Sequence, residues 1–164
     1  MYFINILKLI ILSMLPISEI RGALPFAFFN KIPFYFAFPI ALTFNFLVSF
    51  LIFFFLDTVN KYLMKIPIYS RFFTSFSENA KEKVYKKFAK YEYLGLTLFV
   101  GIPLPITGIW TGALGAWLLQ LERKKVFISL FFGVLIAGLI VTAVLFLGLY
   151  SLKIFNIFLG KASL

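Results

Sequence analysis

The chain has 164 residues, of which 62% are hydrophobic, 21% are aromatic and 13% are charged. Soluble domains are about half apolar and about a quarter charged, so this composition excludes an ordinary soluble protein and predicts an integral membrane protein. The net charge is +10. Because the basic residues cluster between apolar runs, we attribute them to the positive-inside rule and expect no nucleic-acid partner.

Cysteine and histidine are both absent. Their absence excludes disulfides, thiolate and imidazole metal ligands, and Ser–His or Cys–His catalysis. We therefore expect no enzyme activity, no cofactor and no metal site. Of the six acidic residues, only Glu19 lies well inside an apolar region.

The first apolar run, residues 3–15, is too short to span a membrane, which takes about 20 residues. The stretch P-I-S-E-I-R-G-A-L-P follows, from Pro16 to Pro25, and it contains Glu19 and Arg21. A charge in the hydrocarbon core costs roughly 3 kcal/mol and is usually functional or paired. We predict a re-entrant hairpin with breaks at Pro16, Gly22 and Pro25; the alternatives are one kinked helix from 3 to about 29 and, less favoured, a signal peptide.

Residues 34–56 are uncharged and long enough to span the membrane. The section that follows, residues 57–92, holds eight Lys or Arg residues against four acids, which predicts a cytoplasmic loop. Within it, Ala80, Val84, Phe88 and Tyr91 fall on one helical face. This pattern is typical of an amphipathic helix on the inner leaflet, or simply of a solvated topology signal.

A second short run, residues 93–102, meets a second break, G-I-P-L-P-I-T-G. We expect this break to be formed by Gly101, Pro103, Pro105, Gly108 and Gly112. The small residues from 108 to 116 allow another helix to approach closely. The segment ends at a basic cluster, residues 122–125, so both of its ends are expected on the cytoplasmic side, as in a second re-entrant hairpin. Residues 126–152 form the second full span.

The two halves share one plan, and residues 21–25 align with 111–115 at an offset of 90 residues. The predicted fold is an all-α integral membrane protein with two inverted repeats, each a re-entrant broken-helix hairpin followed by a full transmembrane helix. We expect a single membrane domain, 1–164. Its parts are repeat one at 1–60, a basic linker at 61–92, repeat two at 93–152, and a short tail at 153–164.

The pair of motifs E-I-R-G-A-L-P and P-L-P-I-T-G-I-W-T-G-A-L resembles the small multidrug export family of prokaryotic membrane proteins, over nearly the whole chain. More distantly, the chain resembles the DedA and scramblase-like superfamily. That likeness implies opposed re-entrant hairpins with a membrane-embedded acid and arginines, and movement of lipids or lipid phosphates linked to proton-motive force. Glu19 and Arg21 match the charges of the first hairpin, whereas the second break carries no arginine.

The expected function is transport or flipping of an amphipathic or lipid-like substrate, including an anionic one, coupled to protons through Glu19 paired with Arg21. The candidate substrate and proton site consists of Glu19, Arg21, Asn45, Thr107, Trp110 and Thr111. The alternative functions are a non-transporting assembly or scaffold subunit and, less favoured, a membrane enzyme. We expect a homodimer in contact with membrane lipid in a prokaryotic cell membrane, with the loop 57–92 in the cytoplasm.

Overall fold

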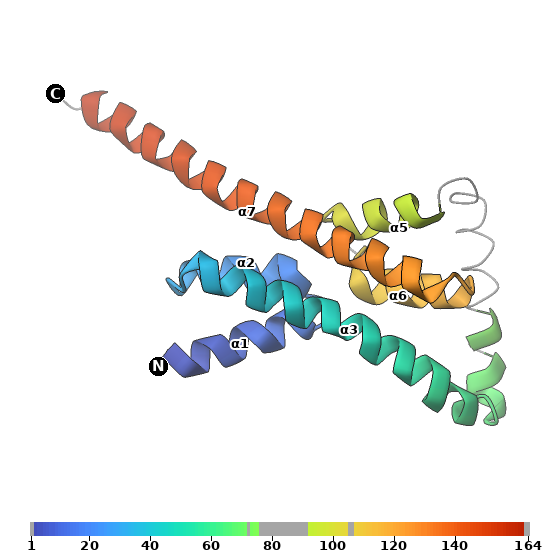
Figure 1. Ribbon diagram of the computed structural model, residues 1–164. Helices are drawn as coiled ribbons and strands as arrows, with labels where there is room; N and C mark the ends of the chain where they lie inside the picture. Colours follow the sequence, from blue (N-terminus) through green and yellow to red (C-terminus); the bar gives the residue numbers. More distant parts are fainter. Residues whose placement is uncertain (1, 72, 76–91, 105–106, 163–164) are drawn as a thin grey trace.

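The computed structural model describes residues 2–71, 73–75, 92–104 and 107–162, and these are all helix or short connections (Figure 1). The helices are α1 (Tyr2–Met14), α2 (Glu19–Phe29), α3 (Phe34–Leu63), α5 (Glu92–Gly101), α6 (Ile109–Leu118) and α7 (Arg123–Ala162). Residues 67–71 and 73–75 are also helical. The predicted amphipathic helix at 80–91 lies outside the described residues.

Two of the helices are long and apolar enough to cross a membrane. The candidate spans are Phe34–Asn60, with a mean hydropathy of 2.2, and Arg123–Gly148, with a mean hydropathy of 2.8. Fewer than half of the residues in each span are buried. Both helices carry exposed large apolar side chains, among them Phe54 and Leu139, as helices surrounded by lipid do.

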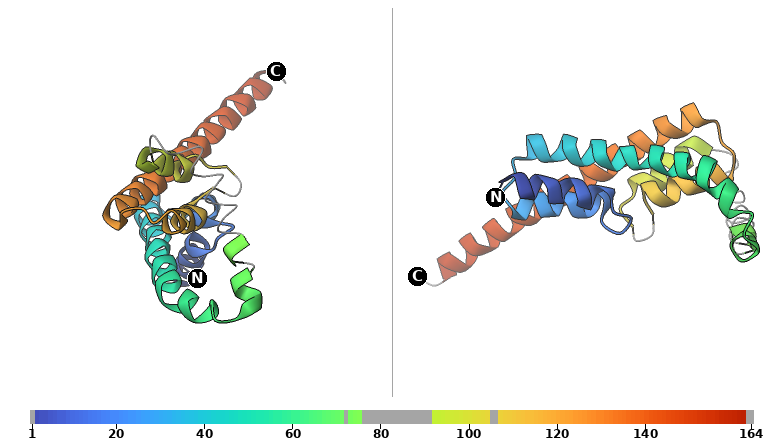
Figure 2. Two further views of the ribbon diagram at one scale, coloured as in Figure 1. Left: turned by 90° about the vertical axis from the view of Figure 1, so that its right-hand side faces the viewer. Right: turned by 90° about the horizontal axis from the view of Figure 1, so that it is seen from below.

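The four shorter helices form two hairpins that point toward each other. In Figure 1, α1 and α2 run antiparallel on one side, and α5 and α6 run antiparallel on the other. The turn of the first hairpin and the turn of the second meet near the middle of the molecule, and the second view in Figure 2 agrees. In the first half α2 packs on α3 and α7, whereas in the second half α5 packs mainly on α7 and α6 on α3.

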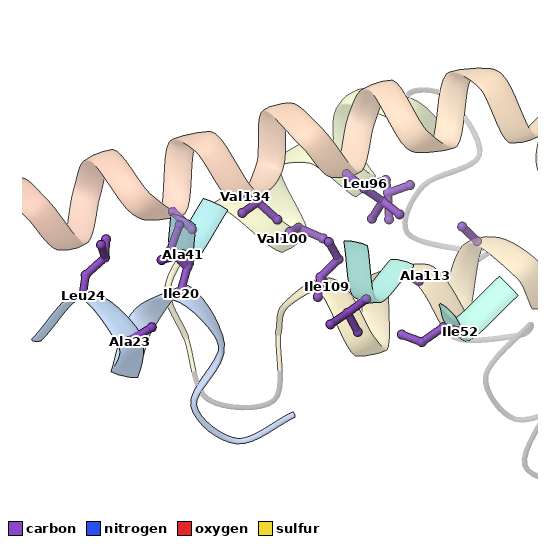
Figure 3. Packing of buried hydrophobic residues seen from close by; sticks show 14 of the residues in the cluster. Ile20, Ala23, Leu24, Ala41, Ile52, Leu96, Val100, Ile109, Ala113 and Val134 are labelled. Carbon is purple, nitrogen blue, oxygen red and sulfur yellow. The ribbon is translucent and has the colours of Figure 1, made fainter. Parts of the chain in front are cut away.

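One hydrophobic core joins the two halves. Figure 3 shows Ile20 and Leu24 of α2 beneath α7, and Val100 and Ile109 beneath the next turns of the same helix. All four side chains are buried. The approach is close because glycines face them: a Cβ at Gly112 would meet Val100 at 2.6 Å and Leu130 at 3.3 Å. The expectation that small residues of α6 allow close helix packing is confirmed here.

Helices α2 and α6 end in the same way. Each is followed by a residue in the left-handed conformation, Lys31 or Gln120, both with φ of +54°. The next residue then donates its N–H back across the last turn, as in a Schellman motif. These bonds join Ile32 to the carbonyl of Ala27 at 2.9 Å and Leu121 to the carbonyl of Ala116 at 3.1 Å.

The first break is shorter than the sequence predicted. It ends at Ser18, and both Gly22 and Pro25 lie inside α2. Proline removes one helical hydrogen bond, but α2 continues because a stripe of buried side chains that includes Ile20 and Leu24 fixes it against its neighbours. Gly112 likewise lies inside α6 and not in the second break.

Both long helices extend further than predicted. Helix α3 continues from residue 56 to Leu63, and α7 continues through the expected tail to Ala162. Charged residues limit the length of a segment that can lie in the hydrocarbon core, but they do not end a helix. The chain has no proline between Pro39 and Pro67 and none after Pro105, so no such breaker stops either helix at the predicted position.

Candidate functional site

A cavity of about 550 Å³ lies where the turns of the two hairpins meet. Its walls are Pro16, Ile17, Glu19, Arg21, Pro103, Leu104 and Thr107. Pro16 and Ile17 come from the turn between α1 and α2, Glu19 and Arg21 from the first turn of α2, and the last three from the break between α5 and α6. Five predicted residues, Glu19, Arg21, Thr107, Pro16 and Pro103, are thus brought together although more than 80 positions separate the two groups in sequence.

Arg21 connects the two halves through its guanidinium group. One terminal nitrogen donates to the carbonyl of Leu104, and the other lies 3.1 Å from Thr107 Oγ1, 3.3 Å from Val100 O and 3.4 Å from Ile102 O. These carbonyls belong to the end of α5 and the chain just after it, where backbone acceptors lack helical partners. A cation is also favoured at this end of a helix by the macrodipole.

Glu19 makes the reciprocal contact with the start of α6. Its carboxylate accepts a hydrogen bond from the backbone N–H of Trp110 at 3.4 Å, and the side chain is 5% exposed. Gly108, just before α6, packs directly against this carboxylate, so a Cβ at residue 108 would overlap it. The start of a helix favours an anion because its first N–H groups are unpaired and its dipole is positive there.

Glu19 and Arg21 do not form a direct ion pair. Among the described residues the ion pairs join Asp57 to Arg123 and Glu122 to Lys125. The two cavity charges interact electrostatically at longer range, but each has its nearest partners in the opposite half of the molecule. Side chains of the first hairpin thus compensate the dipoles of the two helix ends that border the second break. Arg21 lies at the end of α5, and Glu19 lies at the start of α6.

The end of α1 is satisfied by side chains from two other helices. The indole N–H of Trp110 donates to the carbonyl of Met14 at 3.0 Å. The side-chain amide of Asn45 donates to the carbonyl of Ser13 at 2.7 Å, and Asn45 is fully buried. These bonds supply acceptors of the last turn of α1 with donors, as helix ends away from water require.

The remaining predicted residues lie near the cavity wall or away from it. Trp110 and Asn45 support the cavity from behind through α1 and do not line it. Thr111 lies on an apolar groove between α5 and α6 and bonds the carbonyl of Gly108 at 3.3 Å. Gly101 ends α5, and Pro105 lies outside the described residues.

A second polar cluster was missed by the sequence analysis. Arg123 contacts both carboxylate oxygens of Asp57, at 2.9 and 3.0 Å, and the indole N–H of Trp117 donates to Asp57 Oδ1 at 2.9 Å. These contacts join the ends of α3, α6 and α7. A signal was present, because the expected topology puts Asp57 and Arg123 at the same membrane face, where opposite charges can meet.

The chemistry available in the cavity is that of a carboxylate, a guanidinium, a hydroxyl and backbone oxygens beside apolar walls. Within the described ranges, the His, Cys, Asp and Glu side chains form no group of three that could hold a metal ion. A carboxylate in such a place can exchange a proton or contact a cation. Glu19 is the acidic group that lines this cavity.

Comparison with known proteins gives the family. Residues 19–140 match the model of the family described as "Putative small multi-drug export protein", a range that begins at Glu19 and includes the whole second break. No curated protein and no solved structure matches the chain. The family description indicates transport, not an enzymatic activity, and with the two long apolar helices it indicates a membrane protein. The chain belongs to the small multi-drug export protein family.

Proposed function

We propose that this protein is a membrane transporter or flippase that moves an amphipathic or lipid-like substrate and exchanges it for protons through Glu19. The observation that carries the proposal is the cavity between the two hairpin turns. It places a carboxylate and a guanidinium beside apolar walls, in a chain with two membrane-spanning candidates. Charged groups at helix discontinuities are typical of substrate and coupling sites in secondary transporters.

We also propose that both hairpins are re-entrant and that the halves are inverted repeats. The starts of α6 and α7 follow those of α2 and α3 by 90 and 89 residues. Two further similarities support the repeat. Helix α2 begins at a residue with positive φ, Glu19, and α6 begins just after one, Gly108. Both helices end in Schellman motifs. The opposite directions of the hairpins in Figure 1 support the inversion.

The proposed setting is a prokaryotic cell membrane with the basic section 57–92 in the cytoplasm. The positive-inside rule supports this orientation. We further propose a homodimer, because two long helices enclose little space for a pathway, and the outward faces of α3 and α7 carry large apolar side chains that a second copy or lipid would cover.

Proton exchange through Glu19 can be tested in vesicles. The purified chain is reconstituted with the pH dye pyranine inside, and an octylguanidinium or octyl phosphate gradient is applied. At least one of these amphiphiles should drive proton movement in the wild type at a rate at least tenfold above that of empty vesicles. Glu19→Gln should abolish it because the amide cannot carry a proton, whereas Glu122→Gln, which changes an exposed glutamate, should not. Equal proton movement in wild type and Glu19→Gln would exclude the coupling role.

A non-transporting scaffold subunit is the alternative, and one observation favours it. Glu19 and Arg21 each already have partners at a helix end of the second hairpin, so both charges can be explained by structure alone. A scaffold predicts no substrate-driven proton movement at all. It also predicts that Glu19→Gln retains assembly of the protein, because the amide still accepts the bond from Trp110.

A further inference from the structure

The oxygen atoms around Arg21 form a cation site that the chain fills itself. Four oxygens, from the carbonyls of Val100, Ile102 and Leu104 and the hydroxyl of Thr107, lie within hydrogen-bond distance of its two terminal nitrogens. All four belong to the end of α5 and the break, and backbone oxygens at the end of a helix favour positive charge. Both terminal nitrogens of Arg21 therefore have oxygen partners, three at Nη2 and one at Nη1, and these oxygens compensate much of its charge.

Little capacity remains for an anion. The Nε of Arg21 has no hydrogen-bond partner, but it is buried, so a ligand in the cavity cannot reach it. The N-terminal end of α6, the other natural anion site, is occupied by the carboxylate of Glu19. A ligand entering the cavity meets acceptors: the Glu19 carboxylate, the Thr107 hydroxyl and the carbonyls of the break.

We propose that the cavity binds the cationic, hydrogen-bond-donating head of an amphipathic molecule, a guanidinium or an ammonium group, which displaces Arg21 from the oxygens of the break. The apolar part of the molecule lies against Pro16, Ile17, Pro103 and Leu104, in a volume typical of small-molecule sites. The released guanidinium turns toward Glu19, with which it already interacts electrostatically. This inference rests on the proposed function, because it takes the cavity to be the substrate site, and it assigns the charge of the substrate.

Displacement has a consequence that distinguishes it from anion binding. If Arg21 competes with the ligand for the same oxygens, its removal should strengthen binding of a cation, because a self-occupied site lowers the apparent affinity. If Arg21 instead contacts an anionic head, its removal should weaken binding. The two assignments thus predict opposite effects of one substitution.

The test is equilibrium binding of two matched probes to the full chain in lipid nanodiscs. Octylguanidinium and octyl phosphate share one alkyl chain and differ in the charge of the head. In a Trp117→Phe chain the fluorescence of Trp110, whose backbone N–H faces Glu19, reports binding. Protein-free nanodiscs correct for partition into lipid. Octylguanidinium should bind at least tenfold more tightly than octyl phosphate.

Four variants complete the test. Arg21→Ala should raise the octylguanidinium affinity at least tenfold, Thr107→Val should lower it severalfold, and Arg71→Ala, which removes an exposed arginine, should not change it. If Arg21→Ala does not fold, Arg21→Lys should raise the affinity by a smaller factor, because an ammonium cannot contact four oxygens in this geometry. Tighter binding of octyl phosphate that is lost in Arg21→Ala overturns the inference, as does equal binding of both probes. Binding in nanodiscs and proton movement in vesicles are separate measurements. The charge assigned to the substrate can therefore be wrong while proton exchange through Glu19 is observed, and proton exchange can be absent while the cationic probe binds as expected.

Discussion

At the scale of single residues, the site depends on two unusual backbone positions. Glu19 begins α2 with φ of +50°, and Gly108 precedes α6 with φ of +148° and ψ of −170°. The first conformation costs a side-chain-bearing residue about 1 kcal/mol, and the second is essentially restricted to glycine. Gly108 packs against the carboxylate of Glu19. The two unusual backbone positions therefore lie beside the group that we propose exchanges protons.

The Gly108→Ala variant should be destabilised by about 1–3 kcal/mol, because the added Cβ is strained at this φ and overlaps the carboxylate of Glu19. Thermal unfolding in detergent measures the loss. Gly115→Ala is the matched control, since a Cβ at residue 115 meets nothing within 4 Å and α6 gains helix propensity. A melting temperature for Gly108→Ala equal to that of Gly115→Ala would contradict the close approach of Gly108 and Glu19.

The sequence was sufficient to identify the charged residues of the site but not their partners. Glu19 and Arg21 stand out because charges in an apolar chain are costly. The expected ion pair between them did not form, because their nearest partners are N–H and C=O groups at the ends of α6 and α5. Such partners exist in every helix, so composition cannot indicate which helix end approaches which side chain.

At the scale of the helices, the length and hydropathy of the apolar runs predicted which helices form. Several helix ends predicted from prolines and charged residues were wrong. The short helices α1, α5 and α6 and the two spans were all anticipated from apolar runs. Pro25 was taken for a break and α3 was ended near residue 56, because local signals were read without the packing that overrides them. Glycines, however, mark the places where distant helices pack closely, as Gly112 and Gly133 do here.

Helix α7 should be sensitive to side-chain size where it crosses α5. A Cβ at Gly133 would lie 2.7 Å from Val100 Cβ and 3.0 Å from the carbonyl of Thr97, atoms that cannot easily move away. Gly133→Ala should therefore lower stability by about 1–3 kcal/mol. Gly148→Ala, on the same helix with open space around it, serves as the comparison in the thermal unfolding assay. Similar melting temperatures for the two variants would show that α5 and α7 are not this close.

The contact between Asp57 and Arg123 should join the ends of α3 and α7 only weakly. Both side chains are partly exposed, at 32% and 62%, and such pairs contribute about 0–1 kcal/mol. A double-mutant cycle with Asp57→Asn and Arg123→Gln should give a coupling energy in this range that decreases with added salt. A coupling well above about 1 kcal/mol, or one unaffected by salt, would mean that lipid or a partner subunit shields the pair.

At the scale of the whole molecule, the proposed transport site requires two hairpins that enter the membrane from opposite faces. The offset of 90 residues between the halves was predicted from a few shared letters, and the starts of α6 and α7 follow those of α2 and α3 by 90 and 89 residues. A single sequence does not give the depth of each turn in a bilayer, because hydropathy reports the composition of a segment and not its position in the membrane. The orientation of the hairpins is therefore the feature that most needs direct measurement.

Cysteine labelling tests this arrangement most directly, since the natural chain contains no cysteine. Single cysteines are placed at the exposed positions Phe3 and Phe29 of the first hairpin and Leu94 and Gln120 of the second. They are then labelled with a membrane-impermeant maleimide from either face of oriented vesicles. Positions 3 and 29 should react only from the extracytoplasmic face, and positions 94 and 120 only from the cytoplasmic face. Labelling of positions 3 and 29 from opposite faces would show that the first hairpin is one kinked transmembrane helix, and the proposed site within the membrane would then be contradicted.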